Sequence, residues 1–200
     1  MSALTLKQRL ILEFLVSRWE AGASFPSHRD ICARFGYASP KAAADHLAAL
    51  KEKGYLAEVP GSGRANQLTP KALGIPILGA IPAGFPKVEE EREEEALPLN
   101  TRAYGITRRS NAFLLRVHGD SMEGRQIHDG DLVLLEKTED VKDKDVVAAL
   151  IDNESTLKTF VREASRCWLR SENPKYPEIF PAHDLQIQGV ARGVIRFFPL

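Results

Sequence analysis

The sequence predicts an α+β protein with a helical domain in front and a mostly-β domain behind it. Up to Gly54, three apolar stretches repeat with helical spacing, and each follows a residue that commonly begins a helix. From Asn111 onward, short apolar runs alternate with Gly, Asp or Asn turns, a pattern typical of strands. We therefore expect a helical domain at residues 1–70, a linker at 71–100 and a β-rich domain at 101–200.

The composition of the chain sets broad limits on its class. Its 200 residues are 44% hydrophobic, which suffices for two domain cores, and its formal net charge is zero. Residues 1–73 carry 10 Lys and Arg against 6 Asp and Glu, a weak indication of nucleic-acid binding. Cys32 and Cys167 lie far apart, as expected for free thiols in a reducing compartment. No apolar run approaches the ~18 residues of a membrane span and no signal peptide begins the chain, so we expect a soluble, cytoplasmic protein without membrane contact.

Three helices are expected in the first domain. Each begins at a Ser or Thr that has a capping partner three residues later or a proline directly after it: Thr5 with Gln8, Ser27 with Asp30, and Ser39 with Pro40. The first helix is expected to place four apolar side chains on one face: Leu6, Leu10, Phe14 and Leu15. Gly36 is expected to end the second helix and Gly54 the third.

A glycine-containing turn then separates YLAEV from RANQL, which predicts a β-hairpin. Two short helices joined by a tight turn and followed by a hairpin indicate a winged helix-turn-helix, whose third helix enters the DNA major groove. The candidate DNA contacts lie on the second and third helices and the hairpin: His28, Arg29, Ser39, Lys41, Ala42, Ala44, Asp45 and Arg64. The alternative interpretation is a three-helix bundle used for protein contacts.

The second domain is expected to be a compact, mostly antiparallel β structure. Its strand-like runs are AFLLRV, DLVLLEK, DVVAALI, STLKTFV, CWLR and LQIQGVARGVIRFF. Two residues in it suggest chemistry. Ser121 follows Gly-Asp directly after a strand, and Lys158 shares a strand face with Thr156 and Phe160. Taken one at a time, each residue has an ordinary structural interpretation: the serine caps a turn, and the lysine lies exposed on an edge strand.

Together, Ser121 and Lys158 permit a Ser-Lys dyad. A lysine that is neutral because its surroundings are apolar can take the serine proton, and backbone N–H groups at Ser121 and Met122 can hold an oxyanion. Such a dyad needs a substrate, and Ala83-Gly84 offers one, because this small dipeptide lies between prolines beside a glutamate-rich run. The alternative is that the dipeptide only links the two domains.

No cofactor or metal is expected. The HDGD stretch around Asp129 and Asp131 is typical of a turn, because no further carboxylates follow at ligand spacing. The five histidines lack zinc-site spacing, and no glycine-rich phosphate loop is present.

Several segments occur in the order and spacing of one known family: LTLKQRLILEFL, FPSHRDICARFGYASPKAAADHLAALKEKGYL, IPILGAIPAG, FLLRVHGDSM, IHDGDLVLLEKTEDV, LKTF and GVARGVIR. Over essentially its whole length the chain resembles the LexA repressors, autocleaving regulators of the bacterial SOS response. The resemblance implies a DNA-binding front domain and a LexA-like autopeptidase domain behind it. It also implies that the protein binds palindromic operator DNA as a homodimer and represses DNA-damage genes.

The resemblance further assigns roles to residues. It implies that Ala83-Gly84 is the self-cleaved bond, Ser121 the nucleophile and Lys158 the general base. The family's trigger is the RecA filament on single-stranded DNA, which favours the cleavable conformation without supplying catalytic groups. Small side chains and the neighbouring prolines, which restrict the backbone, suit a peptide that must enter the site.

The chain departs from the family pattern in two places. Lys41 and Ala44 stand where the family often has acidic or amide residues, which leaves the operator sequence open. The run at 89–95 is unusually acidic and is expected to be a solvated loop, or else to affect cleavage or RecA contact. Two alternatives to an SOS repressor also stay open: a prophage-type repressor with the same chemistry, and a non-cleaving regulator with an idle dyad.

Overall fold

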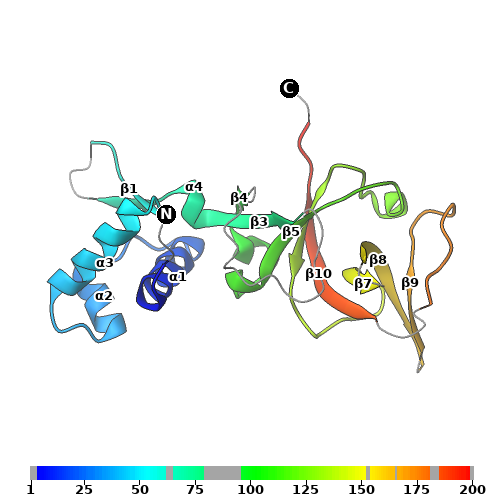
Figure 1. The fold of residues 1–200 in the computed structure, drawn as a ribbon, viewed down its shortest axis with the longest axis horizontal. Helices are drawn as coiled ribbons and strands as arrows, with labels where there is room; N and C mark the ends of the chain where they lie inside the picture. The colour runs from blue at the N-terminus through cyan, green and yellow to red at the C-terminus, as the bar shows by residue number, and fades with distance from the viewer. Residues whose placement is uncertain are drawn as a thin grey trace. The chain divides into compact units, whose positions relative to one another are not determined.

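The computed structural model describes residues 4–61, 65–78, 96–151, 154–164, 166–180 and 185–198. The chain divides into two compact units. The first comprises residues up to Gly74 together with Ala96–Arg102, and the second comprises Ile75–Glu95 and Ala103–Leu200. The long helices belong to the first unit and the long strands to the second (Figure 1). None of the helices in the described ranges is long and apolar enough to cross a membrane.

The first unit contains three helices and a two-stranded hairpin: α1 (Leu6–Glu20), α2 (His28–Phe35), α3 (Pro40–Glu52), β1 (Leu56–Glu58) and β2 (Asn66–Leu68). The expected helix starts are confirmed. Thr5 and Ser27 each form a capping box with the residue three positions later. Ser39 is the N-cap of α3 and Pro40 its first residue, although the Ser39 side chain makes no capping hydrogen bond.

Gly36 creates the turn between α2 and α3. Its φ of 68° lies in the left-handed region, and its N–H donates to the carbonyl of Cys32. A side chain at this φ would be strained, so glycine ends α2 here and lets the chain turn into α3. The helix-turn-helix and hairpin predicted from the sequence are therefore present.

The core of the first unit is formed by Ile11, Leu15, Ile31, Ala43, Leu47, Leu50 and Leu56. Of the four residues expected on one face of the first helix, Leu15 is buried. Leu6 and Leu10, by contrast, are 73% and 44% exposed, so the face expected from the sequence is not the face that packs in the core. Leu6 and Leu10 satisfy helical spacing, but Ile11 and Leu15 satisfy it equally, and the latter pair faces the other helices.

Two short elements of the first unit are not evident in the sequence pattern: α4 (Pro70–Leu73) and β4 (Ala96–Pro98). Thr69 caps α4, since its side chain accepts a hydrogen bond from the N–H of Ala72. Ala72 and Leu73 are buried. Four residues are too few for a helical pattern to be recognised in the sequence.

The second unit is built on one sheet with strand order β3-β5-β6-β10-β7-β8-β9 (Figure 1). The strands are β3 (Gly74–Leu78), β5 (Ala112–Arg116), β6 (Leu132–Glu136), β7 (Val146–Ile151), β8 (Glu154–Glu163), β9 (Arg166–Arg170) and β10 (Gln186–Ile195). Two short 3-10 helices of this unit are η2 (Arg109–Asn111) and η3 (Glu123–Arg125), and a third, η1 (Thr101–Tyr104), spans the sequence boundary between the units. All six strands expected after Asn111 are confirmed.

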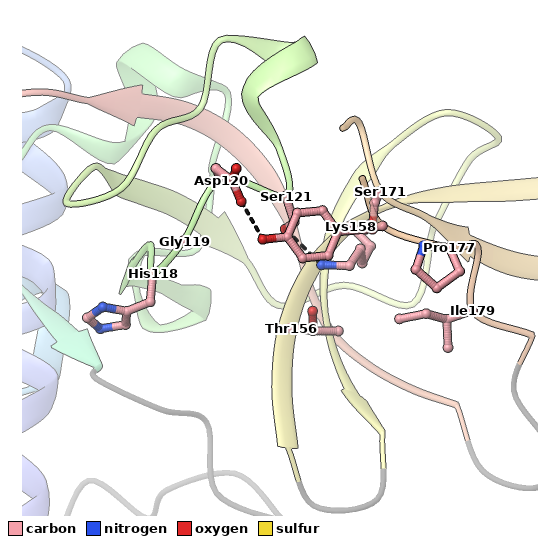
Figure 2. Close-up of a pocket in the computed structure, with 10 residues that line it drawn as sticks. His118, Gly119, Asp120, Ser121, Thr156, Lys158, Ser171, Pro177 and Ile179 are labelled. Carbon is pink, nitrogen blue, oxygen red and sulfur yellow. Dashed lines mark hydrogen bonds between the residues drawn. The ribbon is translucent and has the colours of Figure 1, made fainter. Parts of the chain in front are cut away.

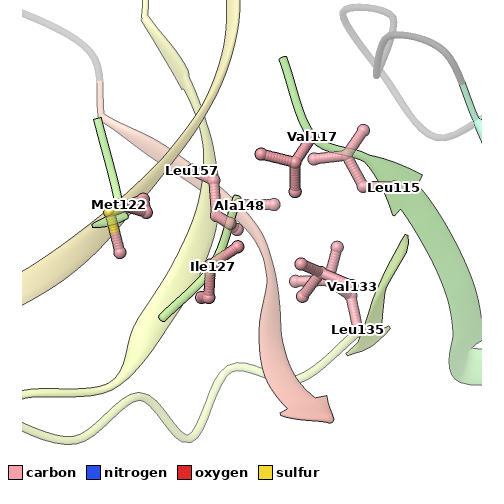
Figure 3. Packing of buried hydrophobic residues seen from close by; sticks show 8 residues of the cluster. All are labelled: Leu115, Val117, Met122, Ile127, Val133, Leu135, Ala148 and Leu157. Carbon is pink, nitrogen blue, oxygen red and sulfur yellow. The ribbon is translucent and has the colours of Figure 1, made fainter. Parts of the chain in front are cut away.

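Most neighbouring strands in this sheet are antiparallel, as expected. The exception is the pair β3 and β5, which run parallel with Ile77 opposite Leu114. One cluster of buried side chains joins the inner strands to the segment that follows β5 (Figure 3): Leu115, Val117, Met122, Ile127, Val133, Leu135, Ala148 and Leu157. This cluster fixes the surroundings of Ser121.

Candidate functional site

Ser121 lies in the serine loop, residues 117–131, which connects β5 to β6. The N–H of Val117 donates to the carbonyl of Asp131 at 2.9 Å, which joins the two ends of the loop. Met122, directly after the serine, is only 1% exposed and packs in the cluster of Figure 3. The loop is thus held by buried apolar groups, while Ser121 itself stays partly accessible.

Lys158 lies in the middle of β8, which pairs with β7 on one side and β9 on the other. It is opposite Val147 and is only 7% exposed. The interpretation of Lys158 as an exposed edge-strand lysine is therefore wrong. Burial away from water disfavours the ammonium and lowers the pKa of Lys158 from its ordinary value.

The structure brings Lys158 and Ser121 together. The lysine Nζ lies 2.9 Å from the serine Oγ (Figure 2). It also donates a hydrogen bond, at 3.0 Å, to the carbonyl of Leu157. When the amine is neutral, its lone pair can accept the serine proton at the same separation. The geometry thus suits a nucleophile beside its base, although 37 residues separate the two in the sequence.

Two adjoining cavities meet at this pair of side chains. One has a volume of about 290 Å³ and the other about 140 Å³, and both are lined by His118, Ser121, Thr156 and Lys158. The larger cavity is also lined by Pro177 and Ile179, which Figure 2 shows on the far side of Lys158 from His118. A peptide segment entering here meets the serine hydroxyl and the lysine amine together.

The backbone at Ser121 offers candidate oxyanion donors. Within the ranges that the structure describes, the N–H groups of Ser121 and Met122 donate to no protein acceptor. The carbonyl of Ser121 accepts from the N–H of Glu172 at 2.8 Å, which fixes the orientation of this part of the backbone. Fixed, unused N–H groups next to a nucleophile are suited to stabilise developing negative charge.

The sequence did not point to the segment at residues 171–177, which lies against the serine loop. Asn173 and Tyr176 hydrogen-bond to Asp120, the residue before the serine, and Ser171 and Tyr176 line the larger cavity. The stretch SENPKYP has the composition of an ordinary loop, and only the tertiary fold brings it to Ser121. No local sequence signal identifies such residues.

The carboxylates of the HDGD stretch have protein partners. Asp129 Oδ1 accepts from the N–H of Gly119 at 2.7 Å. Asp131 is paired with the Arg196 guanidinium through two hydrogen bonds of 2.6 and 2.7 Å, which hold the pKa of the carboxyl below its ordinary value. In the described part of the chain, no group of three or more His, Cys, Asp and Glu is placed to hold a metal ion.

The candidate DNA contacts lie on α2 and α3 of the first unit. His28, Arg29, Ser39, Lys41 and Asp45 are exposed, whereas Ala42 and Ala44 are half-buried. Arg64, the candidate in the hairpin, lies outside the described residues. The candidate cleavage site Ala83-Gly84 and the acidic run at 89–95 also lie outside them.

Comparison with known proteins defines the class of each part of the chain. Residues 1–65 match the LexA DNA binding domain, and residues 76–192 match the Peptidase S24-like family. The chain therefore joins a helix-turn-helix DNA-binding domain to a peptidase-like β domain that contains both Ser121 and Lys158.

Similarity over the whole length identifies the family. The chain is 43% identical to the LexA repressor of Verrucomicrobium spinosum, with 96% of this chain and 97% of that protein covered. It is 38% identical to the LexA repressor of Opitutus terrae (96% and 97% covered) and 37% identical to that of Pseudomonas chlororaphis (98% and 100% covered). The protein belongs to the LexA repressor family.

Proposed function

We propose that this protein represses SOS genes by binding palindromic operator DNA as a homodimer, and that it inactivates itself by cutting its own Ala83-Gly84 bond. Membership of the LexA repressor family supports repression, and the exposed start of α3 suits a major-groove contact. The contact between Ser121 and Lys158 supports the cleavage. The RecA filament on single-stranded DNA is the proposed trigger.

The proposed reaction uses side chains of this chain alone. Neutral Lys158 takes the proton of Ser121 while Oγ attacks the carbonyl carbon of Ala83 and forms a tetrahedral oxyanion. The N–H groups of Ser121 and Met122 stabilise that oxyanion. The C–N bond then breaks, and the lysine ammonium gives its proton to the amine of Gly84.

An ester between Ala83 and Ser121 remains after this first step. Lys158, neutral again, takes a proton from water as the water attacks the ester carbonyl. Collapse of the second tetrahedral intermediate returns the proton to Ser121 and releases the carboxylate of Ala83. RecA contributes no reacting group in this scheme and acts by favouring the conformation in which the peptide lies in the cavity.

The observation that carries this proposal is the 2.9 Å contact between Lys158 Nζ and Ser121 Oγ within a buried strand environment. An amine can act as a base only when it is neutral, and burial shifts its equilibrium toward the neutral form. An exposed lysine at the same distance would remain charged at neutral pH.

The test is incubation of the purified full-length protein at alkaline pH, followed by mass spectrometry. The wild type is expected to yield fragments 1–83 and 84–200, whereas Ser121→Ala and Lys158→Ala remain intact. Both variants should bind operator DNA as the wild type does, because the dyad lies in the second unit. Cleavage of either variant, or cleavage at another bond, would contradict the assignment.

Two other functions are less well supported. A prophage-type repressor would use the same chemistry on other target genes, but the similar proteins are named LexA repressors. A non-cleaving regulator would not need a buried lysine beside a serine. Genomic footprinting of the uncut protein separates the first alternative by the location of its operators.

A further inference from the structure

The segment at residues 171–177 is hydrogen-bonded to the serine loop at several points. The N–H of Gly124 donates to the carbonyl of Glu172 at 2.7 Å, and the Asn173 side chain donates to the carbonyl of Asp120 at 2.9 Å. A Cβ on Gly124 would lie 2.4 Å from the Glu172 carbonyl oxygen, so only glycine permits this approach. The two segments are therefore joined closely on one side of the nucleophile.

Asp120 fixes the position of Tyr176 within this arrangement. The Tyr176 hydroxyl donates to Oδ1 of Asp120, and Lys175 Nζ donates to Oδ2 at 3.1 Å. These two donors lower the pKa of the Asp120 carboxyl from its ordinary value, so the group is ionised at neutral pH. An ionised acceptor strengthens the tyrosine hydrogen bond.

The tyrosine held in this way lines the larger cavity, together with Ser121, Lys158, Pro177 and Ile179. The cavity volume of about 290 Å³ lies at the lower limit of the ~300–1,000 Å³ common for ligand pockets. The Tyr176 ring forms part of the wall of this small cavity beside the serine. Removal of the Tyr176 ring would enlarge the cavity beside the serine.

We propose that Tyr176, anchored by Asp120, is a specificity-determining wall that admits only small side chains next to the bond attacked by Ser121. The substrate class is a peptide with alanine- or glycine-sized residues at the cut, as in Ala83-Gly84. This inference rests on the proposed self-cleavage. It adds a size limit set by a residue outside the dyad.

The first test measures self-cleavage rates of the full chain at alkaline pH. Ala83→Leu is expected to slow cleavage about 10- to 100-fold when Tyr176 is present, because overpacking costs roughly 1–3 kcal/mol. In the Tyr176→Ala background, Ala83→Leu should slow cleavage much less. Tyr176→Phe is the matched control: it keeps the ring but removes the hydroxyl that Asp120 holds, so the effect of Ala83→Leu should lie between those in the wild type and in Tyr176→Ala. If Ala83→Leu slows cleavage equally in the wild type, Tyr176→Phe and Tyr176→Ala, Tyr176 does not set the size limit.

A second test does not depend on which bond is cut. A fluorophosphonate labels an active serine: the Oγ–P bond forms, the P–F bond breaks, fluoride leaves, and Lys158 takes the serine proton. The ratio of labelling rates for a bulky and a small alkyl fluorophosphonate should rise about tenfold in Tyr176→Ala, a change of about 1.4 kcal/mol in relative barrier. Ser121→Ala controls for labelling at other sites.

The two readouts separate failure of the wall from failure of the proposed function. If the labelling ratio changes but the wild type gives no fragment 1–83, cleavage at Ala83-Gly84 is refuted and the size limit set by Tyr176 is still supported. If the wild type is cleaved normally, but Tyr176→Ala neither changes the labelling ratio nor reduces the effect of Ala83→Leu on the rate, the size limit is refuted and the proposed function is still supported.

Discussion

Lys158 is held in an environment that suits its neutral form better than its charged form. Among the described residues it has two hydrogen-bond acceptors, Ser121 Oγ and the carbonyl of Leu157, and neither carries a charge. Buried charges are normally paired, because desolvation of an unpaired ion is costly. In the described part of the chain no carboxylate raises the pKa of Lys158, and desolvation lowers it.

This environment predicts how the rate of self-cleavage depends on pH. Only the neutral amine accepts the Ser121 proton, so the rate should rise from pH 6 and level off above the pKa of Lys158. Because burial lowers that pKa, the plateau should begin below the ordinary lysine value of about 10.4. Rate constants for fragment appearance between pH 6 and 10.5 provide the measurement.

Lys158→Arg is a matched control for this prediction. Its guanidinium keeps a positive charge on a long side chain but does not lose its proton in this pH range. The variant is therefore expected to remain uncut at every pH tested. A wild-type rate that stays constant or falls as the pH rises would mean that Lys158 is not the base.

At the scale of elements, the sequence predicted those structures whose signals are local. Capping residues located the starts of α1, α2 and α3, and alternation located the six strands from β5 to β10. The pattern could not decide which stripe of α1 is buried, because Leu6 with Leu10 and Ile11 with Leu15 have the same spacing. That choice depends on the helices packed against α1.

Structure that depends on distant segments was not predicted. The parallel pairing of β3 with β5 joins residues 37 positions apart, and no local pattern specifies it. Ser121 and Lys158 were found from the sequence because each has a local context that suggests chemistry. Asp120 and Tyr176 were missed, because their importance comes only from lying near the serine.

The residue directly after strand β10, Arg196, forms an ion pair with the end of the serine loop whose removal should be costly. Arg196 donates two hydrogen bonds to Asp131, which is only 2% exposed. Arg196→Met leaves that carboxylate with the His128 N–H as a donor but without its charged partner, and since the Arg196 side chain is itself 41% exposed, we expect the free energy of unfolding to fall by about 2 kcal/mol. Chemical denaturation of the Ser121→Ala background, which prevents cleavage, gives the measurement.

The pH dependence of the Asp131 pair has a definite sign. The pKa of Asp131 is lower in the folded state, so the pair stabilises the protein above about pH 4 and loses this effect as the pH falls further. The matched control is Arg192→Met, since its partner Glu136 is 15% exposed against 2% for Asp131, so the loss of free energy of unfolding should be smaller, about 1 kcal/mol. Equal losses from the two variants would contradict the assigned role of Arg196.

Helix α3 presents Lys41 at its exposed N-terminal end. If Lys41 contacts a base edge, Lys41→Ala should cost about 1–3 kcal/mol in binding and relax the preference at one operator position. If it contacts only phosphate, affinity should fall equally for all operator sequences. The slope of the logarithm of the binding constant against the logarithm of the salt concentration should then decrease in magnitude by about one. Selection from randomised operators at several salt concentrations distinguishes the two outcomes.

Lys51→Ala is the control for the Lys41 measurement. Lys51 lies in the last turn of the same helix and is paired with Glu58, so its loss removes an equal charge far from the proposed contact. An unchanged affinity and an unchanged preference for Lys41→Ala would exclude both contacts.

At the scale of the whole molecule, cleavage leaves the core of the DNA-binding unit intact. Its buried cluster, from Ile11 to Leu56, and the half-buried Leu68 packed against it all precede Ala83. A cut between Ala83 and Gly84 therefore removes none of these side chains from the front fragment, although it separates Ala96–Arg102, which belong to the same unit, from the helices. Cleavage must then inactivate the repressor by some means other than unfolding the helix-turn-helix. The proposal supplies one, because the cut disconnects the DNA-binding unit from the unit that forms the dimer.

Fragment 1–83 is therefore expected to bind the operator about 10²- to 10⁴-fold more weakly than the uncut dimer. A dimer engages its second half-site intramolecularly, and this avidity disappears when each helix-turn-helix binds alone. Gel-shift titration of the fragment and of uncut Ser121→Ala gives the comparison, and circular dichroism verifies that the fragment is folded. Fusion of the fragment to an unrelated dimeric coiled coil should restore most of the affinity. Equal binding by the monomeric fragment and the uncut dimer would mean that cleavage inactivates the repressor by some other route.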